Sequence, residues 1–467
     1  MKKVFYVFTL CVSLSVAFSA CSDDDKEENV LAPAHAVDHL VFYDTDIEEQ
    51  KIGGTLSWQL PSQENKIDGY VIYLGESATS KDAKLGEVSK GATSFAIPNG
   101  TPFGKYLLVI ARNTAGESTN IASLPVEDLI ALPQPGVPKT LGAFILNRGA
   151  YQAGNASLAY YNLALGEMIP NVYQTVNKKA LGDSAEQALI YGSKMYITVT
   201  TSNRLAILDE TGEEIAGIQP TTDGSNGKEP QSPRGLAAYN GKVYVSYYDG
   251  HSVAVLDTAS LEIENTVTVG RYPEALAIAG GKLYVANSGG LDYDGMGYGH
   301  TVSVIDLETF TVEKEIEVAL NPTRLAADSE GDVYVISMGN YGDVPNTLQR
   351  IDAASGEVTE MGKGSLFSLA NDKLYVIYAS WGDPNVSYKK YNALTETVES
   401  ENFIAGATTF AAISALGVDP IGGDIYIADA EDFVSTGTLY IFSPEGRQKA
   451  KKDTGGSDPS AILFHIQ

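Results

Sequence analysis

The sequence predicts an all-β protein: a seven-bladed β-propeller preceded by a smaller β-sandwich. The first observation is a repeated pattern, in which a short strand around a tyrosine is followed by a loop and a second strand that often ends in Asp, as in residues 282–306. The second is its spacing, because successive anchors lie 40 to 52 residues apart. A period of this length, filled with short strands, is typical of sheets arranged around an axis. Seven anchors predict seven blades: Phe144, Tyr196, Tyr244, Tyr284, Tyr334, Tyr375 and Tyr426.

The third observation concerns the two ends of the repeated region, residues 142–467. Pro459–Phe464 has the pattern of an innermost strand but no second strand follows it, whereas the first copy, at Phe144, has no innermost strand before it. We expect the end of the chain to complete the first blade and close the ring, which removes unpaired edges.

Residues 35–130 are predicted to form a separate β-sandwich. Short alternating segments separated by turn residues indicate its strands, and Trp58 is expected in its core. The proline-rich segment 131–141 is predicted to be a linker, since proline favours an extended chain. The clearest strand segments are Thr55–Leu60, Ile67–Leu74, Ser94–Ile97 and Tyr106–Ala111.

The N-terminus has the features of an export signal. Two lysines precede an apolar run that is too short to span a membrane, and small residues lead to Cys21, so residues 1–20 are predicted to be a lipoprotein signal peptide. Lipidation of Cys21 would anchor the chain to a membrane through residues 21–34, an acidic flexible tether. The alternative is a chance cysteine after a signal peptide. Cys11 lies inside the signal, so no disulfide is expected.

Charge and motifs narrow the class of function. A formal net charge of −27 argues against nucleic acid as a partner. No nucleophile elbow, phosphate-binding glycine loop or paired histidine motif occurs, so we expect neither an enzyme nor a bound metal or catalytic cofactor. Asp292–Gly295 has the start of a calcium loop without the remaining ligands. His251 and His300 occupy equivalent loops, where turn residues or ligand donors are favoured over a metal pair.

Several segments resemble known families. Leu283–Ser288 with Val302–Asp306 looks like the YVTN and YncE-type bacterial propellers. Asn321–Pro345 and Asp419–Tyr440 resemble the DUF5074-like surface lipoproteins of the cobalamin-binding BtuG family. The order Trp58, Asp68-Gly-Tyr70, Tyr106 and Gly116-Glu-Ser118 resembles a fibronectin type III domain.

The BtuG resemblance implies a non-enzymatic lipoprotein of the outer membrane. Such a protein captures cobalamin or another corrinoid as a bound ligand and passes it to a TonB-dependent transporter. The acidic residues after Cys21 resemble the surface-export signal of Bacteroidetes lipoproteins, which implies that the chain faces the cell exterior.

The loops that open on one face of the predicted propeller are rich in aromatic and charged residues. Rigid aromatics with a few hydrogen-bonding groups suit a large amphipathic ligand, although several of these residues would also serve to order their own turns. Glycan or peptide binding on the same face is the alternative hypothesis, and a third hypothesis is an enzyme that uses a metal or a quinone cofactor. The candidate ligand-binding residues are Tyr151, Arg234, Tyr248, Asp249, Arg271, Tyr293, Tyr298, His300, Arg324, Tyr341, Asp343, Trp381, Asp383, Asp429 and Phe433.

Overall fold

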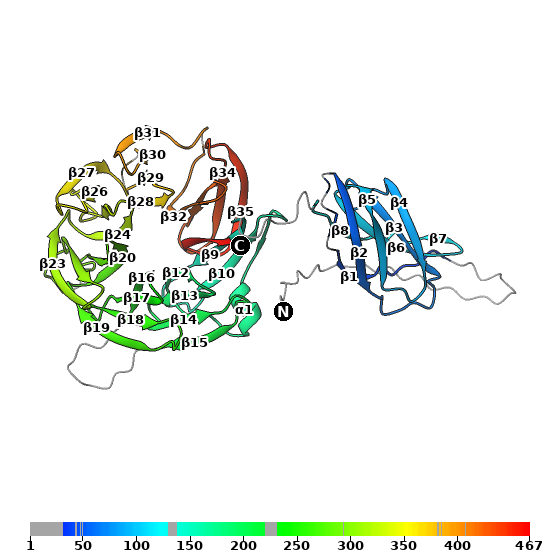
Figure 1. Ribbon diagram of the computed structural model, residues 1–467, viewed down its shortest axis with the longest axis horizontal. Helices are drawn as coiled ribbons and strands as arrows, with labels where there is room; N and C mark the ends of the chain where they lie inside the picture. Colours follow the sequence, from blue (N-terminus) through cyan, green and yellow to red (C-terminus); the bar gives the residue numbers. More distant parts are fainter. Residues whose placement is uncertain are drawn as a thin grey trace. The chain divides into compact units, whose positions relative to one another are not determined.

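The computed structural model describes residues 31–128, except 43, 47 and 49, and residues 138–467, except 220–230, 293, 381, 382, 384 and 407. The chain divides into two compact units, Met1–Val137 and Pro138–Gln467 (Figure 1). The predicted signal peptide, Cys21, Tyr293 and Trp381 lie outside the described residues. Within those residues, no helix combines the length and the apolar character that crossing a membrane requires.

The first unit contains two antiparallel sheets that share one core. Trp58 and Tyr70 meet in it edge to face, with ring centroids 5.9 Å apart, beside Leu56, Ile72 and Val109. The prediction that Trp58 is a core residue is confirmed, since its exposure is 4%. One sheet has the order β1 (Asp38–Val41), β2 (Lys51–Gln59), β5 (Ser94–Pro102). The other has the order β4 (Ala83–Ser89), β3 (Gly69–Gly75), β6 (Tyr106–Asn113), β7 (Gly116–Glu117), with β8 (Ala122–Pro125) also paired to β6.

The described part of the second unit contains seven four-stranded antiparallel sheets, which we number one to seven in chain order. Sheet one consists of β11 (Glu167–Ile169), β10 (Ser157–Asn162), β9 (Thr140–Asn147) and β36 (Pro459–Ile466), and α1 (Val172–Asn177) follows β11. Sheet two consists of β12 (Ala185–Tyr191), β13 (Lys194–Val199), β14 (Arg204–Leu208) and β15 (Glu214–Ile218). Sheet three consists of β16 (Pro233–Tyr239), β17 (Lys242–Tyr247), β18 (Ser252–Asp257) and β19 (Ile263–Thr268).

The remaining four sheets repeat the same order. Sheet four consists of β20 (Pro273–Ala279), β21 (Lys282–Asn287), β22 (Thr301–Asp306) and β23 (Thr311–Glu317). Sheet five consists of β24 (Pro322–Ala327), β25 (Val333–Ser337), β26 (Thr347–Ile351) and β27 (Val358–Lys363). Sheet six consists of β28 (Leu366–Ala370), β29 (Lys373–Tyr378), β30 (Ser387–Asn392) and β31 (Thr397–Ser400). Sheet seven consists of β32 (Ile413–Val418), β33 (Ile425–Asp429), β34 (Thr436–Phe442) and β35 (Gln448–Ser457).

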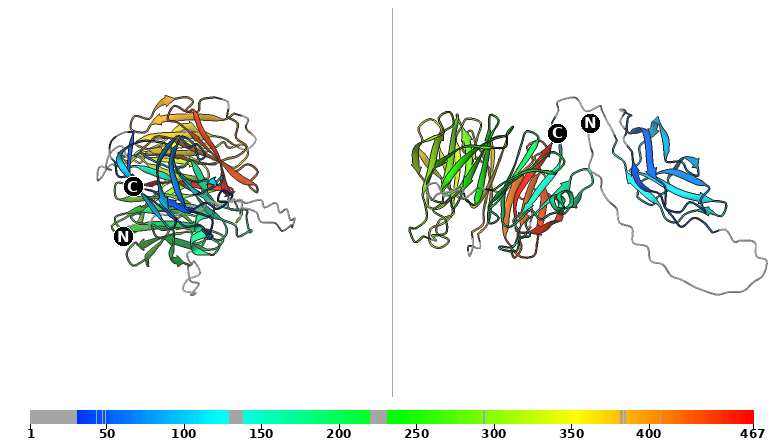
Figure 2. Two further views of the ribbon diagram at one scale, coloured as in Figure 1. Left: turned by 90° about the vertical axis from the view of Figure 1, so that its right-hand side faces the viewer. Right: turned by 90° about the horizontal axis from the view of Figure 1, so that it is seen from below.

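The sheets are arranged around a common axis, as in a propeller. One edge strand of each sheet, which we call its inner strand, contacts the inner strands of the two neighbouring sheets. Their cyclic order is β36, β12, β16, β20, β24, β28, β32 and back to β36 (Figure 1). The right-hand view of Figure 2 shows the same sheets from the side. β36 pairs with β9, which aligns Ile462 with Ile145 and Leu463 with Phe144. The prediction that the end of the chain completes the first sheet is therefore confirmed. β9 begins at Thr140, two residues before the expected start of this region.

The anchoring tyrosines fill the space between consecutive sheets. Tyr196, Tyr334 and Tyr426 have no exposed surface. The ring of Tyr426, in sheet seven, packs against Phe464 of sheet one at a centroid distance of 5.1 Å. The second strand of each sheet thus carries one aromatic ring that packs against the next sheet. This recurring contact explains why the aromatic anchors recur along the sequence at the period of the sheets.

The aspartates that end the third strands order the following turns. Oδ1 of Asp257, Asp306 and Asp352 each accepts hydrogen bonds from backbone N–H groups two and three residues further on. Asp is common at such positions because its side chain bonds its own local backbone. These carboxylates are turn residues, as the sequence predicted.

Candidate ligand-binding site

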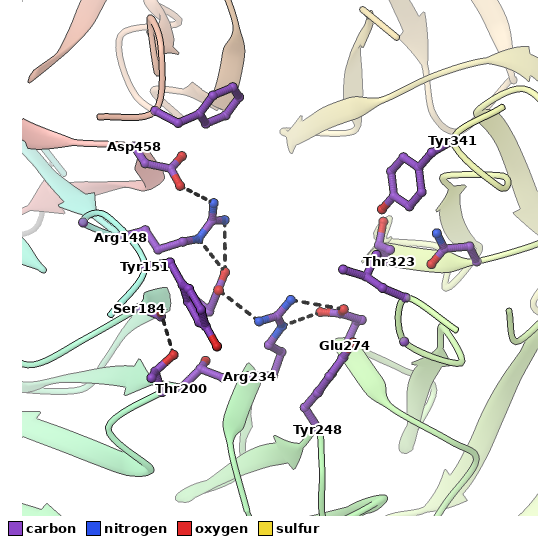
Figure 3. Close-up of a pocket in the computed structure, with 17 residues that line it drawn as sticks. Arg148, Tyr151, Ser184, Thr200, Arg234, Tyr248, Glu274, Thr323, Tyr341 and Asp458 are labelled. Carbon is purple, nitrogen blue, oxygen red and sulfur yellow. Dashed lines mark hydrogen bonds and ion pairs between the residues drawn. The ribbon is translucent and has the colours of Figure 1, made fainter. Parts of the chain in front are cut away.

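A cavity of about 440 Å³ opens at the end of the axis where the inner strands begin (Figure 3). Its lining combines two kinds of segment: the start of an inner strand, and the loop between the second and third strands of a sheet. Among the described residues, the inner-strand starts come from sheets one to five, and the loops come from every sheet except sheet six. The antiparallel order of each sheet places both kinds of segment at the same end.

Five of the predicted site residues line this cavity: Tyr151, Arg234, Tyr248, Tyr341 and Phe433. Three of them stand on the rim with large exposed areas, 75% for Tyr151, 54% for Tyr341 and 45% for Phe433. Exposed aromatic side chains around a concavity are suited to contact with a ligand, because they contribute much contact area for few rotatable bonds.

The interior of the cavity is a row of alternating charges. Arg148 Nη1 donates to Asp458 Oδ2 at 2.6 Å, and Arg148 Nε donates to Glu186 Oε2 at 3.0 Å. Arg234 Nη1 donates to the other oxygen of Glu186 at 2.9 Å, and its Nε donates to Glu274 Oε2 at 2.7 Å. These bonds give the order Asp458, Arg148, Glu186, Arg234, Glu274, which runs across sheets one to four. Figure 3 labels four of the five residues and draws the bonds as dashed lines. We call these five residues the ion-pair row.

The ion-pair row keeps its central groups ionised. Burial by itself would raise the pKa of Glu186, but the guanidinium groups of Arg234 and Arg148 lower this pKa below the ordinary glutamate value. Burial opposes the charge of Arg234, yet Glu186 and Glu274 raise the pKa of Arg234 above its ordinary value. Asp458, at the end of the row, differs, because burial raises its pKa and Arg148 only partly offsets that effect.

Tyr248 forms a fixed wall beside the row. The guanidinium carbon of Arg234 lies 4.8 Å from the centroid of the Tyr248 ring, a cation–π contact. The same ring packs against Tyr272 at 4.9 Å, and the ring of His251 packs against Tyr272 at 4.7 Å. Gly290 has φ +72°, and a β-carbon there would lie 3.1 Å from the Tyr248 hydroxyl, so glycine allows the loop to approach this wall.

Several predicted residues lie outside the lining and are bonded to residues of the same loop or of an adjacent one. Arg271 Nη1 donates to Asp294 Oδ2 at 2.5 Å. Asp249 accepts from Ser232 Oγ at 2.5 Å, and Asp343 accepts from Asn340 Nδ2 at 2.8 Å. Arg271, Asp249 and Asp343 are not among the residues that line the cavity, and each has a nearby hydrogen-bond partner.

The same holds for two further carboxylates. Asp383 Oδ2 accepts from the Tyr378 hydroxyl at 2.6 Å. Asp429 is buried, and its two oxygens accept the backbone N–H groups of Ala411 and Ala412 at 2.7 Å each, so it positions a loop.

Tyr298, His300 and Arg324 are also absent from the lining. Tyr298 supports the rim indirectly, since its ring packs edge to face on Tyr341 at 6.1 Å. In the suspected calcium segment, Asp292 Oδ1 and Asp294 Oδ1 accept the backbone N–H groups of Gly297 and Met296. Within the described residues, no group of three or more His, Cys, Asp or Glu side chains is placed to hold a metal ion.

Sequence reasoning missed four members of the ion-pair row, Arg148, Glu186, Glu274 and Asp458. A signal was available for two of them. The strand pairings place Glu186, Arg234 and Glu274 at one equivalent position, directly after the first residue of the inner strand, and Thr323 occupies it in sheet five. Aligning the repeats on this position would have identified Glu186 and Glu274.

The fold and the cavity together define an all-β, propeller-like protein with a charged, aromatic-rimmed site on one face. The family model described as "Domain of unknown function (DUF5074)" matches residues 141–452, so the chain belongs to this family. The DUF5074 part of the expected resemblance is confirmed. A search of curated proteins gave no significant match.

Solved structures with a similar fold include proteins of different descriptions. A quinonprotein alcohol dehydrogenase-like protein from Bacteroides thetaiotaomicron aligns with 92% of this chain and 99% of its own, at 15% identity and a TM-score of 0.51. A putative 6-phosphogluconolactonase from Bacteroides fragilis aligns with 70% of this chain and 98% of its own, at 13% identity and a TM-score of 0.48. At these identities the likeness concerns the fold alone.

Proposed function

We propose that this protein is a lipid-anchored lipoprotein of the outer cell surface, without catalytic activity, that captures a large amphipathic small molecule in the cavity. The preferred ligand is cobalamin or another corrinoid, delivered to a TonB-dependent transporter. In this proposal the second unit is a seven-bladed β-propeller of the YncE and BtuG type, and the first is a fibronectin type III-like sandwich that acts as a spacer.

The observation that carries the proposal is the combination of exposed rim aromatics with an interior of charges fixed by one another. The ion-pair row holds Glu186 and Arg234 in their ionised forms, since the pKa of each is shifted away from neutrality. General acid–base catalysis needs a group whose pKa lies near the working pH. Fixed charges and dipoles serve recognition better, because they present hydrogen-bonding groups that are already oriented.

A corrinoid suits this arrangement chemically. It combines a broad macrocycle with peripheral amides, so its rings can lie against Tyr151, Tyr341 and Phe433 while amides bond to the charged interior. A cavity of about 440 Å³ accommodates only part of so large a molecule, which would therefore rest on the rim. Sugars also stack on exposed tyrosines, so glycan binding remains the second candidate.

The test is calorimetric titration of cyanocobalamin into the chain from residue 22 onward. We expect binding that weakens at least tenfold when Tyr151 and Tyr341 are both replaced by Ala. Tyr239→Ala is the matched control, because Tyr239 is 48% exposed but lies at the opposite end of β16 from the cavity. Absence of binding to the unchanged protein at micromolar concentrations would exclude a corrinoid, and a glycan array would then test the second candidate.

The anchoring part of the proposal is tested separately. Cys21→Ser should release the protein from the membrane fraction and abolish labelling by a radioactive fatty acid. Continued labelling of the Cys21→Ser protein would show that the lipid anchor is assigned to the wrong residue.

A further inference from the structure

Arg324 differs from Arg148 and Arg234, the two arginines that line the cavity, because its guanidinium has no bonding partner among the described residues. It follows Thr323, a lining residue, at the start of β24. Arg148 and Arg234 are bonded to carboxylates of the ion-pair row, whereas no hydrogen bond or ion pair joins the Arg324 guanidinium to any described residue. A charged group in the interior without a partner is costly, and a ligand of opposite charge would relieve that cost.

Arg324 is not itself a lining residue of the cavity, but the residues that act on its charge are. Burial lowers the pKa of Arg324, repulsion from Arg148 lowers it further, and attraction to Glu274 and Glu186 partly offsets both effects. The three neighbours that exert these effects all line the cavity. The Arg324 guanidinium therefore lies within the electrostatic range of the ion-pair row without belonging to it.

Two hydroxyl groups lie on the same side of the cavity. Thr323 Oγ1 is buried and has no hydrogen-bond partner among the described residues. Figure 3 shows the Thr323 and Tyr341 side chains next to each other, across the cavity from Asp458 and Arg148. Buried polar atoms are nearly always bonded, so an unbonded hydroxyl that faces a cavity indicates a place for a ligand atom.

We propose that Arg324, Thr323 and Tyr341 form a subsite for an anionic oxygen group of the ligand, a phosphate or a carboxylate. Arginine binds both groups through two parallel hydrogen bonds, and the two hydroxyls add donors beside it. Arg148 and Arg234 are already bonded to carboxylates, and the carboxylates of the ion-pair row repel an anion. The side of the cavity at Thr323 and Tyr341 is therefore the favourable place for an anionic group. The inference deepens the proposed capture function by assigning a chemical group to one part of the cavity.

A purely structural role for Arg324 makes a different prediction. The ion-pair row contains two arginines and three carboxylates, and Arg324 would then serve to balance its net negative charge at longer range. In that case Arg324→Gln should lower the melting temperature of the ligand-free protein. If the role of Arg324 is instead to bind the ligand, Arg324→Gln should leave the melting temperature of the ligand-free protein unchanged or raise it, because an unpaired interior charge is removed.

The experiment is a titration of inorganic phosphate, and separately of acetate, into the chain from residue 22 onward, followed by calorimetry. We expect saturable binding of at least one anion, weakened on the order of tenfold to hundredfold by Arg324→Gln, the range for hydrogen bonds to a charged group. Arg324→Lys should weaken it less, and Thr323→Val should weaken it while leaving the fold intact. Arg271→Gln is the matched control, since Arg271 is on the same face but bonded to Asp294. No binding of either anion, or equal binding by Arg324→Gln, would overturn the subsite.

A corrinoid pair separates this inference from the proposed function. Cyanocobalamin carries a phosphodiester in its nucleotide loop and cyanocobinamide lacks it, so the unchanged protein should prefer cobalamin and Arg324→Gln should lose that preference. If neither corrinoid binds, the corrinoid proposal fails while the phosphate and acetate titrations still decide the subsite. If both bind equally and neither anion binds, capture stands and the subsite is refuted.

Discussion

The ion-pair row makes a quantitative prediction for Arg234→Met. The change removes both bonds to Glu274 and one bond to Glu186, while Glu186 keeps Arg148. Glu274 is then left without a bonded partner, with a side chain only 15% exposed. Removing one partner of a buried pair costs about 3–5 kcal/mol, and we take the lower end, about 3 kcal/mol, because the Arg234 side chain is 26% exposed.

The expected change in melting temperature follows from the size of the unit. With about 2.1 cal/mol/K of unfolding entropy per residue, the 330 or so residues of Pro138–Gln467 give roughly 4 °C for this cost. Differential scanning calorimetry of the unchanged and Arg234→Met proteins at neutral pH measures it. Adding Glu274→Gln to Arg234→Met should restore more than half of the loss, since the stranded charge disappears.

The same ion pairs predict a pH dependence. Because arginines lower the pKa of Glu186 in the folded state, this stabilisation is fully present above the unfolded glutamate pKa of about 4.3 and is lost as the pH falls through the lower folded value. Arg234→Met should therefore differ less from the unchanged protein in acid than at neutral pH. A melting temperature unaffected by Arg234→Met, or a double variant no more stable than the single one, would refute the reasoning.

Three further changes test the fold. Truncation after Asp458 removes β36, the inner strand of sheet one, and leaves β9 paired only to β10. The second unit should then lose its cooperative thermal transition by circular dichroism, and an unchanged transition would contradict the closure of the ring. Tyr334→Phe should lower the free energy of unfolding by about 1 kcal/mol in chemical denaturation, because the Tyr334 hydroxyl donates to Ala393 O at 2.6 Å. Tyr426→Phe should be neutral or stabilising, because the buried Tyr426 hydroxyl has no partner among the described residues. Equal losses for the two variants would count against this contrast. Burial lowers the pKa of His465 in the folded protein, so stability should decline as the pH falls below about 6.5, where the unfolded histidine gains a proton first. His465→Phe should flatten this decline in melting temperature. If the decline persists in the variant, His465 is not its cause.

The sequence by itself determined the repeating sheets and their closure. The tyrosine pattern predicted the second strand of each sheet, since a large ring is needed wherever two sheets face each other, and the unmatched segment at residues 459–464 predicted the partner of the first sheet. The aspartates at third-strand ends and Trp58 were equally predictable. Each of these features depends on neighbours in the chain or on a period that the chain itself displays.

The interior of the cavity was decided only by the tertiary structure. Arg148 and Asp458 are 310 residues apart and meet because β36 joins β9. Whether a loop residue faces a ligand also depends on whether nearby groups of the protein already bond to it. Asp429 is buried and accepts two backbone N–H groups, whereas Tyr341 is exposed on the rim. The sequence shows which charged residues are available. Which of them form ion pairs depends on donor–acceptor distances of about 3 Å, and only the closed ring of sheets sets those distances.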